Sequence, residues 1–258
     1  MKPDIKRGLL FETCALDYDQ YRPGYPKAVV SEAIALAGLR SSSRLLEIGC
    51  GTGKATVSFA AHGYTMDCVD PGRKLIGFAR RSCRDWPHVS FYVGRFEDVP
   101  LPVENYDMVL SAQAFHWIEP RGRAERVARV LRRGGSLVLL QNYPGKDVDP
   151  AIERLSAAIR AESGGAMERW DYFDTVASLK RELERCPMLD GVSVARHRWA
   201  QRYSAEGYAG LFRTYSDYLS LPRKVQLRIA RRIREIVEEN GGHVMRSYDT
   251  ILLHARRR

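Results

Sequence analysis

Residues 45–56 read Leu-Leu-Glu-Ile-Gly-Cys-Gly-Thr-Gly-Lys-Ala-Thr and form the most informative segment of the chain. An apolar run with one acidic residue, Glu47, leads directly into three alternating glycines, and a helix-like stretch follows. Glycine is needed where a side chain would hold a ligand away from the backbone or where φ is positive. The first N–H groups of a helix are unpaired and favour an anionic or carboxylate-bearing ligand. The segment therefore predicts a strand, a ligand-binding turn and a helix.

Spacing separates this turn from two nucleotide-binding loops. A Walker A loop would require glycine at position 48 and serine or threonine at position 55, where the chain has Ile48 and Ala55. A dinucleotide-binding Gly-x-Gly-x-x-Gly loop would require glycine at position 54, which is Lys54. Neither loop fits.

Short apolar runs recur on both sides of this segment, and helix-like or turn-rich stretches separate them. Such an alternation requires parallel strands that are joined by right-handed crossovers. We therefore expect an α/β fold with a doubly wound, Rossmann-like sheet of seven mostly parallel strands. The last strand should be antiparallel, a helical cap should be present, and ligands should bind at the carboxyl ends of the strands. The expected strands are 44–49, 64–70, 89–94, 106–113, 135–141, 192–203 and 243–255.

The length and the pattern favour one domain that spans residues 1–258. Its core is expected at about 27–149, 191–203 and 243–255, with a first helix at 26–39. A lid or cap is expected from about 1–26, 150–190 and 204–242, where helical patterns at 150–186 and 205–240 would cover the carboxyl edge of the sheet. The terminal arginines are expected to be a disordered tail.

Composition bounds the class of partner. The 41 Lys and Arg residues outnumber the 31 Asp and Glu residues, and the net charge is +10, which suits nucleic acid or an anionic small substrate. The densest basic stretch, 223–240, has apolar residues at helical spacing, so we interpret it as a surface helix with a solvated basic face. The five scattered cysteines are expected to be buried, and no metal site is predicted.

No apolar run approaches the roughly 20 residues that span a bilayer, and no signal-peptide pattern opens the chain. We therefore expect a cytoplasmic protein that does not contact membranes. The sequence carries no signal for an oligomeric state.

Acidic residues stand at the ends of the second and third expected strands. Asp70 ends the second strand, where a carboxylate can accept both hydroxyls of a ribose. Phe96, Glu97 and Asp98 follow the third strand, where a carboxylate and an apolar side chain can hold the amino edge and the face of an adenine. Three strand ends therefore predict an adenosine site, although an acid at the start of a helix is the alternative for Glu97 or Asp98.

The chain resembles the class I S-adenosylmethionine-dependent methyltransferases, and more narrowly the group that includes the trans-aconitate and juvenile hormone acid carboxyl methyltransferases. The glycine loop is typical of the whole superfamily, whereas the Tyr-Arg-Pro and Phe-His-Trp segments are typical of the narrower group. The segments that carry the resemblance are 18–26, 45–56, 69–71, 96–98, 111–117 and 130–140.

The resemblance implies S-adenosylmethionine as the cofactor. Glu47, Gly49, Gly51 and Gly53 would line its methionine part, and Asp70 with Pro71 would bind its ribose. Its adenine would lie at Phe96 and Glu97 or Asp98. The chain at Ser111, Ala112 and Gln113 would pass beside the sulfonium. These assignments come from the matching positions of the family motifs.

The acceptor side is expected around His116, for which we consider three roles: orienting a substrate, acting as a general base, or packing within the fold. Trp117 would form a wall of the acceptor site. The proline-containing opening segment could be a lid or a strap on the first helix, with Tyr21 and Arg22 near the cofactor and Tyr18 and Gln20 near the acceptor. Further aromatic walls are predicted at Trp170 and Tyr172.

The expected activity is transfer of a methyl group to a small acceptor through oxygen, with a carboxylate favoured over a hydroxyl. An ionised carboxylate needs donors to orient it and no base. Methylation of RNA, suggested by the net charge, is the first alternative, and cofactor binding without methylation is the second. Motifs for methylation of DNA bases are missing from the expected positions, and too few carboxylates follow the fourth and fifth strands for a metal-assisted reaction.

Overall fold

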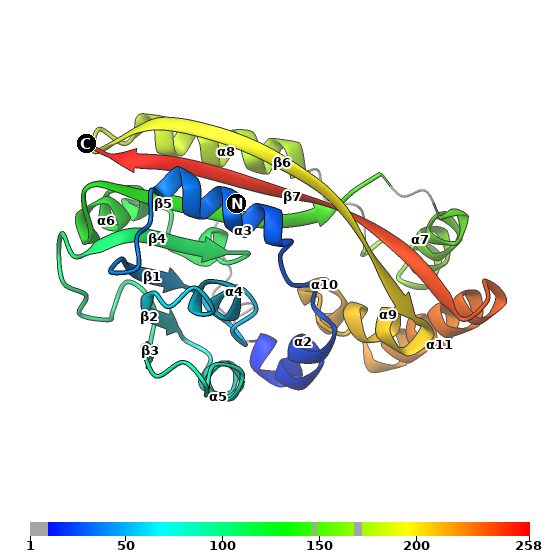
Figure 1. Cartoon of the computed structure of the whole chain (residues 1–258). Helices are drawn as coiled ribbons and strands as arrows, with labels where there is room; N and C mark the ends of the chain where they lie inside the picture. Colours follow the sequence, from blue (N-terminus) through cyan, green and yellow to red (C-terminus); the bar gives the residue numbers. More distant parts are fainter. Residues whose placement is uncertain (1–9, 147–148, 168–171) are drawn as a thin grey trace.

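A computed structural model describes residues 10–146, 149–167 and 172–258, apart from the side chains of residues 10 and 172–174 (Figure 1). Seven strands form one sheet in the order β3-β2-β1-β4-β5-β7-β6. The strands are β1 (Arg44–Ile48), β2 (Thr65–Asp70), β3 (Val89–Val93), β4 (Tyr106–Ala112), β5 (Leu131–Pro144), β6 (Leu189–Ser204) and β7 (His243–Arg257). The helices are η1 (Leu10–Cys14), α2 (Ala15–Tyr21), α3 (Lys27–Ala37), α4 (Thr56–Ala60), α5 (Arg73–Ser82), η2 (Phe115–Trp117), α6 (Arg123–Val130), α7 (Pro150–Glu162), α8 (Tyr172–Arg185), α9 (Ala205–Phe212), α10 (Ser216–Leu219) and α11 (Arg223–Glu239).

The pairing of the strands confirms the predicted α/β architecture. Strands β1 to β5 pair in parallel, and β7 runs antiparallel to both β5 and β6. All parallel strands therefore present their carboxyl ends at one edge of the sheet. In such sheets the edge at the carboxyl ends is where ligands bind.

Helices cover both faces of the sheet. Helices α3, α4 and α5 contribute to one apolar cluster with Leu45 and Met66, and α6 packs on the other face with Leu137 and Leu139. Helix α8 joins that second face through Leu179 and Leu183. The structure therefore places α8 against the sheet, whereas the sequence assigned the whole of 150–190 to a cap.

The cap is carried by the two longest strands. Strand β5 pairs with β7 only as far as Pro144 and Tyr248, whereas β6 and β7 remain paired out to Ser204 and His243. This ribbon extends past the carboxyl end of β5, and α7, α9 and α11 pack around it (Figure 1). The cap forms a separate apolar cluster that includes Leu155, Tyr208 and Ile233.

The C-terminal residues differ from the expected disordered tail. Strand β7 continues to Arg257, and Arg257 pairs with Leu189. The buried Arg257 guanidinium donates to the backbone oxygen of Leu131 and lies 2.5 Å from Glu104 Oε1. The predicted tail was wrong because the strand has partners that are distant in sequence.

No helix among the described residues is long and apolar enough to cross a membrane. The five cysteines are buried and free. In the described ranges, no three or more His, Cys, Asp or Glu side chains come together as a possible metal site.

Candidate active site at the carboxyl edge

The glycine turn after β1 has a conformation that side chains would oppose. Gly49, Gly51 and Gly53 have φ values of +72°, +56° and +87°, where residues with a Cβ are strained. A Cβ on Gly49 would lie 2.2 Å from the Cβ of Ala114, so this glycine also lets the chain after β4 approach. The turn is thus bare backbone between the ends of β1 and β4.

Asp70 links the end of β2 to this turn. Its Oδ2 accepts a hydrogen bond from the N–H of Gly51 at 2.9 Å, and its Oδ1 accepts one from Gly72 at 2.7 Å. Each carboxylate oxygen can accept a second hydrogen bond. Burial raises the pKa of Asp70, and the two backbone donors lower it by less, so the net pKa is about 6. The neighbouring Pro71 is exposed.

Glu47 is buried inside β1, with 1% of its surface exposed. Its Oε2 accepts a hydrogen bond from Thr56 Oγ1 at 2.6 Å, so this carboxyl holds the start of α4 against the strand. Burial raises the pKa of Glu47 to about 8.

The three predicted residues after β3 lie in different surroundings. Phe96 is buried in the core, and Asp98 is exposed. Glu97 Oε1 accepts from the N–H of Glu119 at 2.9 Å and lies 3.1 Å from Arg95 Nη2. Burial opposes ionisation of Glu97, but these partners outweigh it and lower its pKa. Glu97 therefore ties the third strand end to the chain that follows η2.

The end of β4 is held to both neighbouring strands. The buried Ser111 donates from Oγ to the backbone oxygen of Ile48 at 3.0 Å, and Ala112 is half-buried. Gln113 has a φ of +58°, and its N–H donates to Leu140 O at 2.8 Å. Its side chain donates from Nε2 to Asn142 O at 2.6 Å. The backbone beside the glycine turn is therefore fixed.

Arg22 connects the opening segment to the cap. Its Nη2 donates to Thr214 O at 2.8 Å, and its guanidinium lies over the rings of Tyr18 and Tyr215, at 5.3 and 4.5 Å from their centroids. The Nε atom is buried and has no hydrogen-bond partner. Tyr18 Cε1 lies 3.8 Å from the position that a Cβ on Gly51 would occupy. Arg22 and Tyr18 therefore lie on the glycine-turn side of this segment.

Two other predicted residues of the opening segment face elsewhere. Tyr21 packs on α9, where a Cβ on Gly210 would come within 2.3 Å of its ring. Gln20 is exposed on α2. The sequence predicted Tyr21 near the cofactor and Gln20 near the acceptor, whereas the structure packs Tyr21 against α9 and leaves Gln20 exposed. They lie on other faces of the helix that carries Tyr18.

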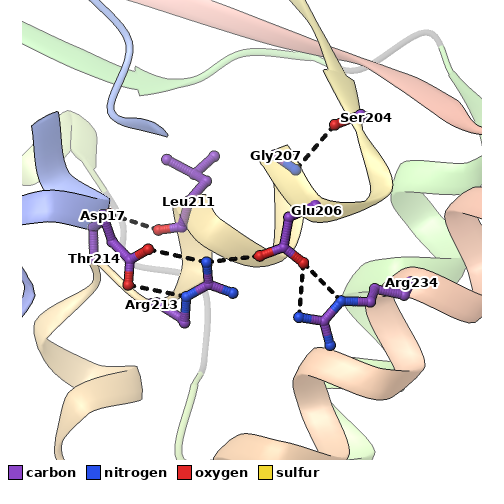
Figure 2. A network of polar contacts seen from close by, with 8 residues as sticks. All are labelled: Asp17, Ser204, Glu206, Gly207, Leu211, Arg213, Thr214 and Arg234. Carbon is purple, nitrogen blue, oxygen red and sulfur yellow. Dashed lines mark hydrogen bonds and ion pairs between the residues drawn. The ribbon is translucent and has the colours of Figure 1, made fainter. Parts of the chain in front are cut away.

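Figure 2 shows the ion-pair network that fastens α2 to the cap. Both Asp17 oxygens accept from the Arg213 guanidinium at 3.0 Å, and Arg213 Nη2 also donates to Glu206 Oε1 at 2.8 Å. The other oxygen of Glu206 accepts from Arg234 on α11 at 2.8 Å. The network therefore joins α2, α9 and α11 close to the helix that carries Tyr18. We call these four residues the α2 latch.

His116 and Trp117 lie in η2, directly after β4. Their rings are 4.9 Å apart, and the half-buried Trp117 meets Phe11 edge-on at 5.8 Å. Desolvation by the surrounding protein lowers the pKa of His116, and the charges of Arg123 and Arg22 act in the same direction, to a value of about 4. The residue is nevertheless exposed on one side. The imidazole is therefore neutral at pH 7.

Arg123 is a buried cation that the sequence analysis missed. It donates to Phe115 O at 2.9 Å and to Ile118 O at 3.3 Å, and both oxygens of Glu182 on α8 accept from it. It therefore fixes the backbone around His116. No local pattern distinguishes this arginine from its many neighbours in the sequence.

A cavity of about 380 Å³ lies between α6 and α8. It is lined by Glu182 but by none of the glycine-turn residues, so it is separate from the candidate site.

Unpartnered buried polar atoms mark further residues that the sequence did not single out. Among the described residues, three of these atoms belong to residues near the carboxyl edge: Arg22 Nε, Thr52 Oγ1 and Gln141 Nε2. Thr52 lies within the glycine turn, and its place between two predicted glycines was the only available signal. Gln141 lies on β5 and had none. Trp170 and the side chain of Tyr172 lie outside the described part of the chain, so their predicted roles stay predictions.

The basic helix α11 has acidic partners for most of its arginines. Arg228 lies 2.7 Å from Glu162, and Arg234 belongs to the α2 latch. Arg231 and Arg232 both pair with Glu235, at 3.6 and 3.0 Å. The positive charge of this helix is therefore locally offset.

Comparison with known proteins links the sheet and the glycine turn to methyltransferases. Residues 46–139 match the family model described as a methyltransferase domain. An uncharacterized methyltransferase of Mycobacterium tuberculosis is 32% identical over 162 residues, which cover 57% of this chain and 64% of that protein. The matched part of this chain therefore spans less than two thirds of that relative.

Solved structures share the fold over most of this chain. A structure from Anaeromyxobacter dehalogenans, which also carries a methyltransferase name, has a TM-score of 0.65 and 22% identity and covers 92% of this chain and 98% of its own. A phosphoethanolamine N-methyltransferase from Haemonchus contortus, in complex with phosphomonomethylethanolamine and S-adenosylhomocysteine, has a TM-score of 0.59 and 12% identity. That match covers 99% of this chain and 59% of the Haemonchus chain.

Proposed function

We infer that this chain, whose residues 46–139 carry a methyltransferase domain, is an enzyme that uses S-adenosylmethionine to methylate a small acceptor. The acceptor atom that we propose is oxygen, with a carboxylate favoured over a hydroxyl. The first part of this proposal follows from the residues at the ends of β1 and β2. The second part follows from the charges around His116.

The residues at the carboxyl edge fit an adenosyl sulfonium cofactor. The bare backbone of Gly49, Gly51 and Gly53 allows close approach of the methionine part. Asp70 keeps one acceptor position on each oxygen for the two hydroxyls of the ribose. The buried Nε of Arg22 has a donor to offer to the methionine carboxylate. The Haemonchus enzyme with bound S-adenosylhomocysteine shares this fold, which agrees with the proposal.

S-adenosylmethionine supplies an activated methyl group when it is bound, so the chain itself must align the acceptor and exclude water. Ser111, Ala112 and Gln113 form a fixed backbone wall next to the glycine turn. Tyr18 and Arg22 cover the same turn from the opening segment. Glu97 would act by holding the backbone beside the adenine, because its oxygen already accepts from Glu119.

The observation that carries the acceptor class is the cation beside His116 that has no acidic partner. Burial is the largest cause of the lowered pKa of His116, and the charges of Arg123 and Arg22 add to it. Glu182 offsets the charge of Arg123, whereas Arg22 has no acidic partner among the described residues, so Arg22 favours an anionic acceptor. A carboxylate acceptor is already ionised at pH 7 and needs no base. A histidine with a pKa of about 4 is also a weak base for a hydroxyl. We therefore propose that His116 and Trp117 orient the acceptor through their N–H groups.

RNA is a weaker candidate for the acceptor. The arginines of α11 lie beside acidic partners, including Glu162 and Glu235, which reduces their attraction for phosphates. Cofactor binding without methylation is the remaining alternative, and only a measurement of turnover separates it from the proposal.

Calorimetry with S-adenosylmethionine, followed by a radiolabelled methyl-transfer screen, tests the proposal. The screen compares small carboxylic acids, phenols and RNA as acceptors. We expect binding of the cofactor and transfer to one or more acids. Absence of binding would overturn the cofactor assignment. Binding with turnover only on RNA would replace the acceptor class, and binding without any turnover would favour a cofactor-binding protein.

A further inference from the structure

Gln141 is a buried amide near the carboxyl end of β5, with 2% of its surface exposed. It points to the same face of the sheet as Leu137 and Leu139, because alternate residues of a strand share a face. The phenol of Tyr143 donates to its Oε1, and its Nε2 has no hydrogen-bond partner. One end of the amide is therefore held and the other end is free.

A buried N–H group without a partner destabilises the folded protein, because its hydrogen bonds to water are lost and nothing replaces them. Leucine has a similar volume and would fill this position in an apolar core without that cost. Asn105 shows that an unused buried donor alone does not mark a site, but Gln141 also lies near the carboxyl end of a parallel strand and is oriented by Tyr143. Its free N–H is therefore a candidate contact for a ligand that accepts a hydrogen bond.

The order of the strands shows on which side of β4 Gln141 lies. Strand β4 lies between β1 and β5, so the glycine turn with Thr52 lies on one side of β4 and Gln141 lies on the other. The N–H of Gln113 donates to Leu140 O and thereby binds the end of β4 to the residue next to Gln141. The chain then enters η2, where Phe115 shares an apolar cluster with Leu139. Gln141 thus belongs to the side of His116 and Trp117, opposite the proposed cofactor turn.

We propose that Gln141 Nε2 binds an oxygen of the methyl acceptor, and that Tyr143 is the positioning residue that turns the amide toward it. The acceptor class is a small carboxylate, whose second oxygen remains available for methylation. This inference rests on the proposed function. It adds a specific neutral donor to the positive charge of Arg22.

The test compares Gln141→Leu with a matched control, Asn105→Leu. Asn105 also has a buried amide nitrogen without a partner, but it directly precedes β4 at the opposite edge of the sheet. Each variant is measured for thermal stability, for S-adenosylmethionine affinity by calorimetry, and for methyl transfer to the best acid of a panel of small carboxylic acids. The side-chain NH2 signal of Gln141, assigned by its loss in Gln141→Leu, is followed while the same acids are added to protein saturated with S-adenosylhomocysteine.

We expect Gln141→Leu to keep its cofactor affinity within about twofold and to raise the KM for the acid about 10-fold or more, as for the loss of a hydrogen bond to a charged group. Asn105→Leu should leave both values unchanged. The NH2 signal of Gln141 should shift when the acid that the enzyme methylates is added. An unchanged KM, or no shift and no turnover with any acid, overturns the inference. A Gln141→Leu variant that loses both thermal stability and cofactor affinity assigns a structural role instead and overturns it as well. Failure of the wild-type protein to bind S-adenosylmethionine is a separate result, because it refutes the proposed function.

Discussion

At the scale of single residues, Asp70 does two things with one carboxylate. It accepts from the backbone N–H groups of Gly51 and Gly72, which shapes the glycine turn, and it keeps acceptor capacity for a ligand. An amide at this position would turn a donor toward one of those two N–H groups. The residue therefore couples the shape of the turn to binding.

We predict that Asp70→Asn weakens the affinity for S-adenosylmethionine about 10-fold or more, because hydrogen bonds to a ribose hydroxyl and to the turn are lost. Calorimetry measures the affinity, and circular dichroism checks the fold. Asp190→Asn is the control for loss of one negative charge, because Asp190 is an exposed residue near the start of β6. If Asp70→Asn and the wild-type protein have equal affinities for S-adenosylmethionine, Asp70 does not bind the cofactor.

Glu47 makes a second prediction at this scale, about pH and stability. Burial raises its pKa from 4.5 to about 8, so the folded protein holds a proton that the unfolded chain releases between these values. The free energy of unfolding should therefore fall as the pH rises toward 8, by at most about 1.4 kcal/mol per pH unit. The raised pKa of Asp70 acts at lower pH. The lowered pKa values of His116 and His254 make the free energy of unfolding rise with pH through 6.5, so the effect of Glu47 is measured above pH 7.

Urea unfolding of the cofactor-free protein between pH 7 and 8 measures this effect. Glu47→Gln retains an acceptor for Thr56 and should abolish the slope. A wild-type protein whose stability stays flat or rises over this range would show that Glu47 is ionised in the folded state.

At the scale of elements, α2 depends on the cap for its position. It is a short helix of seven residues, and the α2 latch ties its Asp17 to Arg213 on the cap side. Short helices are marginal alone, so these contacts and the packing of Tyr21 on α9 decide where α2 lies. Arg22 directly follows α2, so the position of α2 also sets the position of Arg22.

We predict that Arg213→Met weakens S-adenosylmethionine binding by about 3-fold, which corresponds to a partly exposed ion pair of roughly 0.6 kcal/mol. Hydrogen exchange of the α2 amides should increase at the same time. Arg234→Met is the matched control, because it removes the outer arginine of the α2 latch and leaves the pair of Asp17 and Arg213 in place. Similar affinities in the wild-type protein and both variants would show that the cofactor does not need this anchor.

The elements also show what a sequence can predict. The strands of the parallel core are mostly apolar runs, and the turn after β1 can be recognised from its glycines. The apolar face of α8 predicts a helix, but it does not tell whether that face meets the sheet or the cap. Likewise, Tyr18, Gln20 and Tyr21 are close in sequence but lie on different faces of α2. Arg123 and Gln141 acquire their roles only through partners that are distant in sequence.

At the scale of the whole molecule, the long ribbon of β6 and β7 explains both the cap and the end of the chain. One end of the ribbon carries α7, α9 and α11 beyond the carboxyl edge, and the other end pairs Arg257 with Leu189 (Figure 1). Sequence periodicity predicted both strands but ended them short, because Arg256 and Arg257 continue β7 and Asp190 and Gly191 lie at the start of β6 outside the apolar alternation. The extra length is set by pairing between the two strands.

The net charge of +10 is also a property of the whole molecule, and it yields the last prediction. A triple variant, Arg228→Gln, Arg231→Gln and Arg232→Gln, removes three positive charges from α11 and leaves the α2 latch intact. If the acceptor is a small carboxylate bound at the carboxyl edge, methyl transfer to it should be equal in the variant and the wild-type protein. The binding of single-stranded RNA should be equally weak in both at 150 mM salt.

Fluorescence anisotropy at several salt concentrations measures the RNA arm of this comparison. An RNA methyltransferase that uses this helix would instead bind RNA tightly at low salt, and the triple variant would have a salt slope that is shallower by about 2. Such a change in slope would show that the basic helix binds the RNA substrate. Equal slopes would mean that the positive charge of α11, already offset by Glu162 and Glu235, does not select the acceptor.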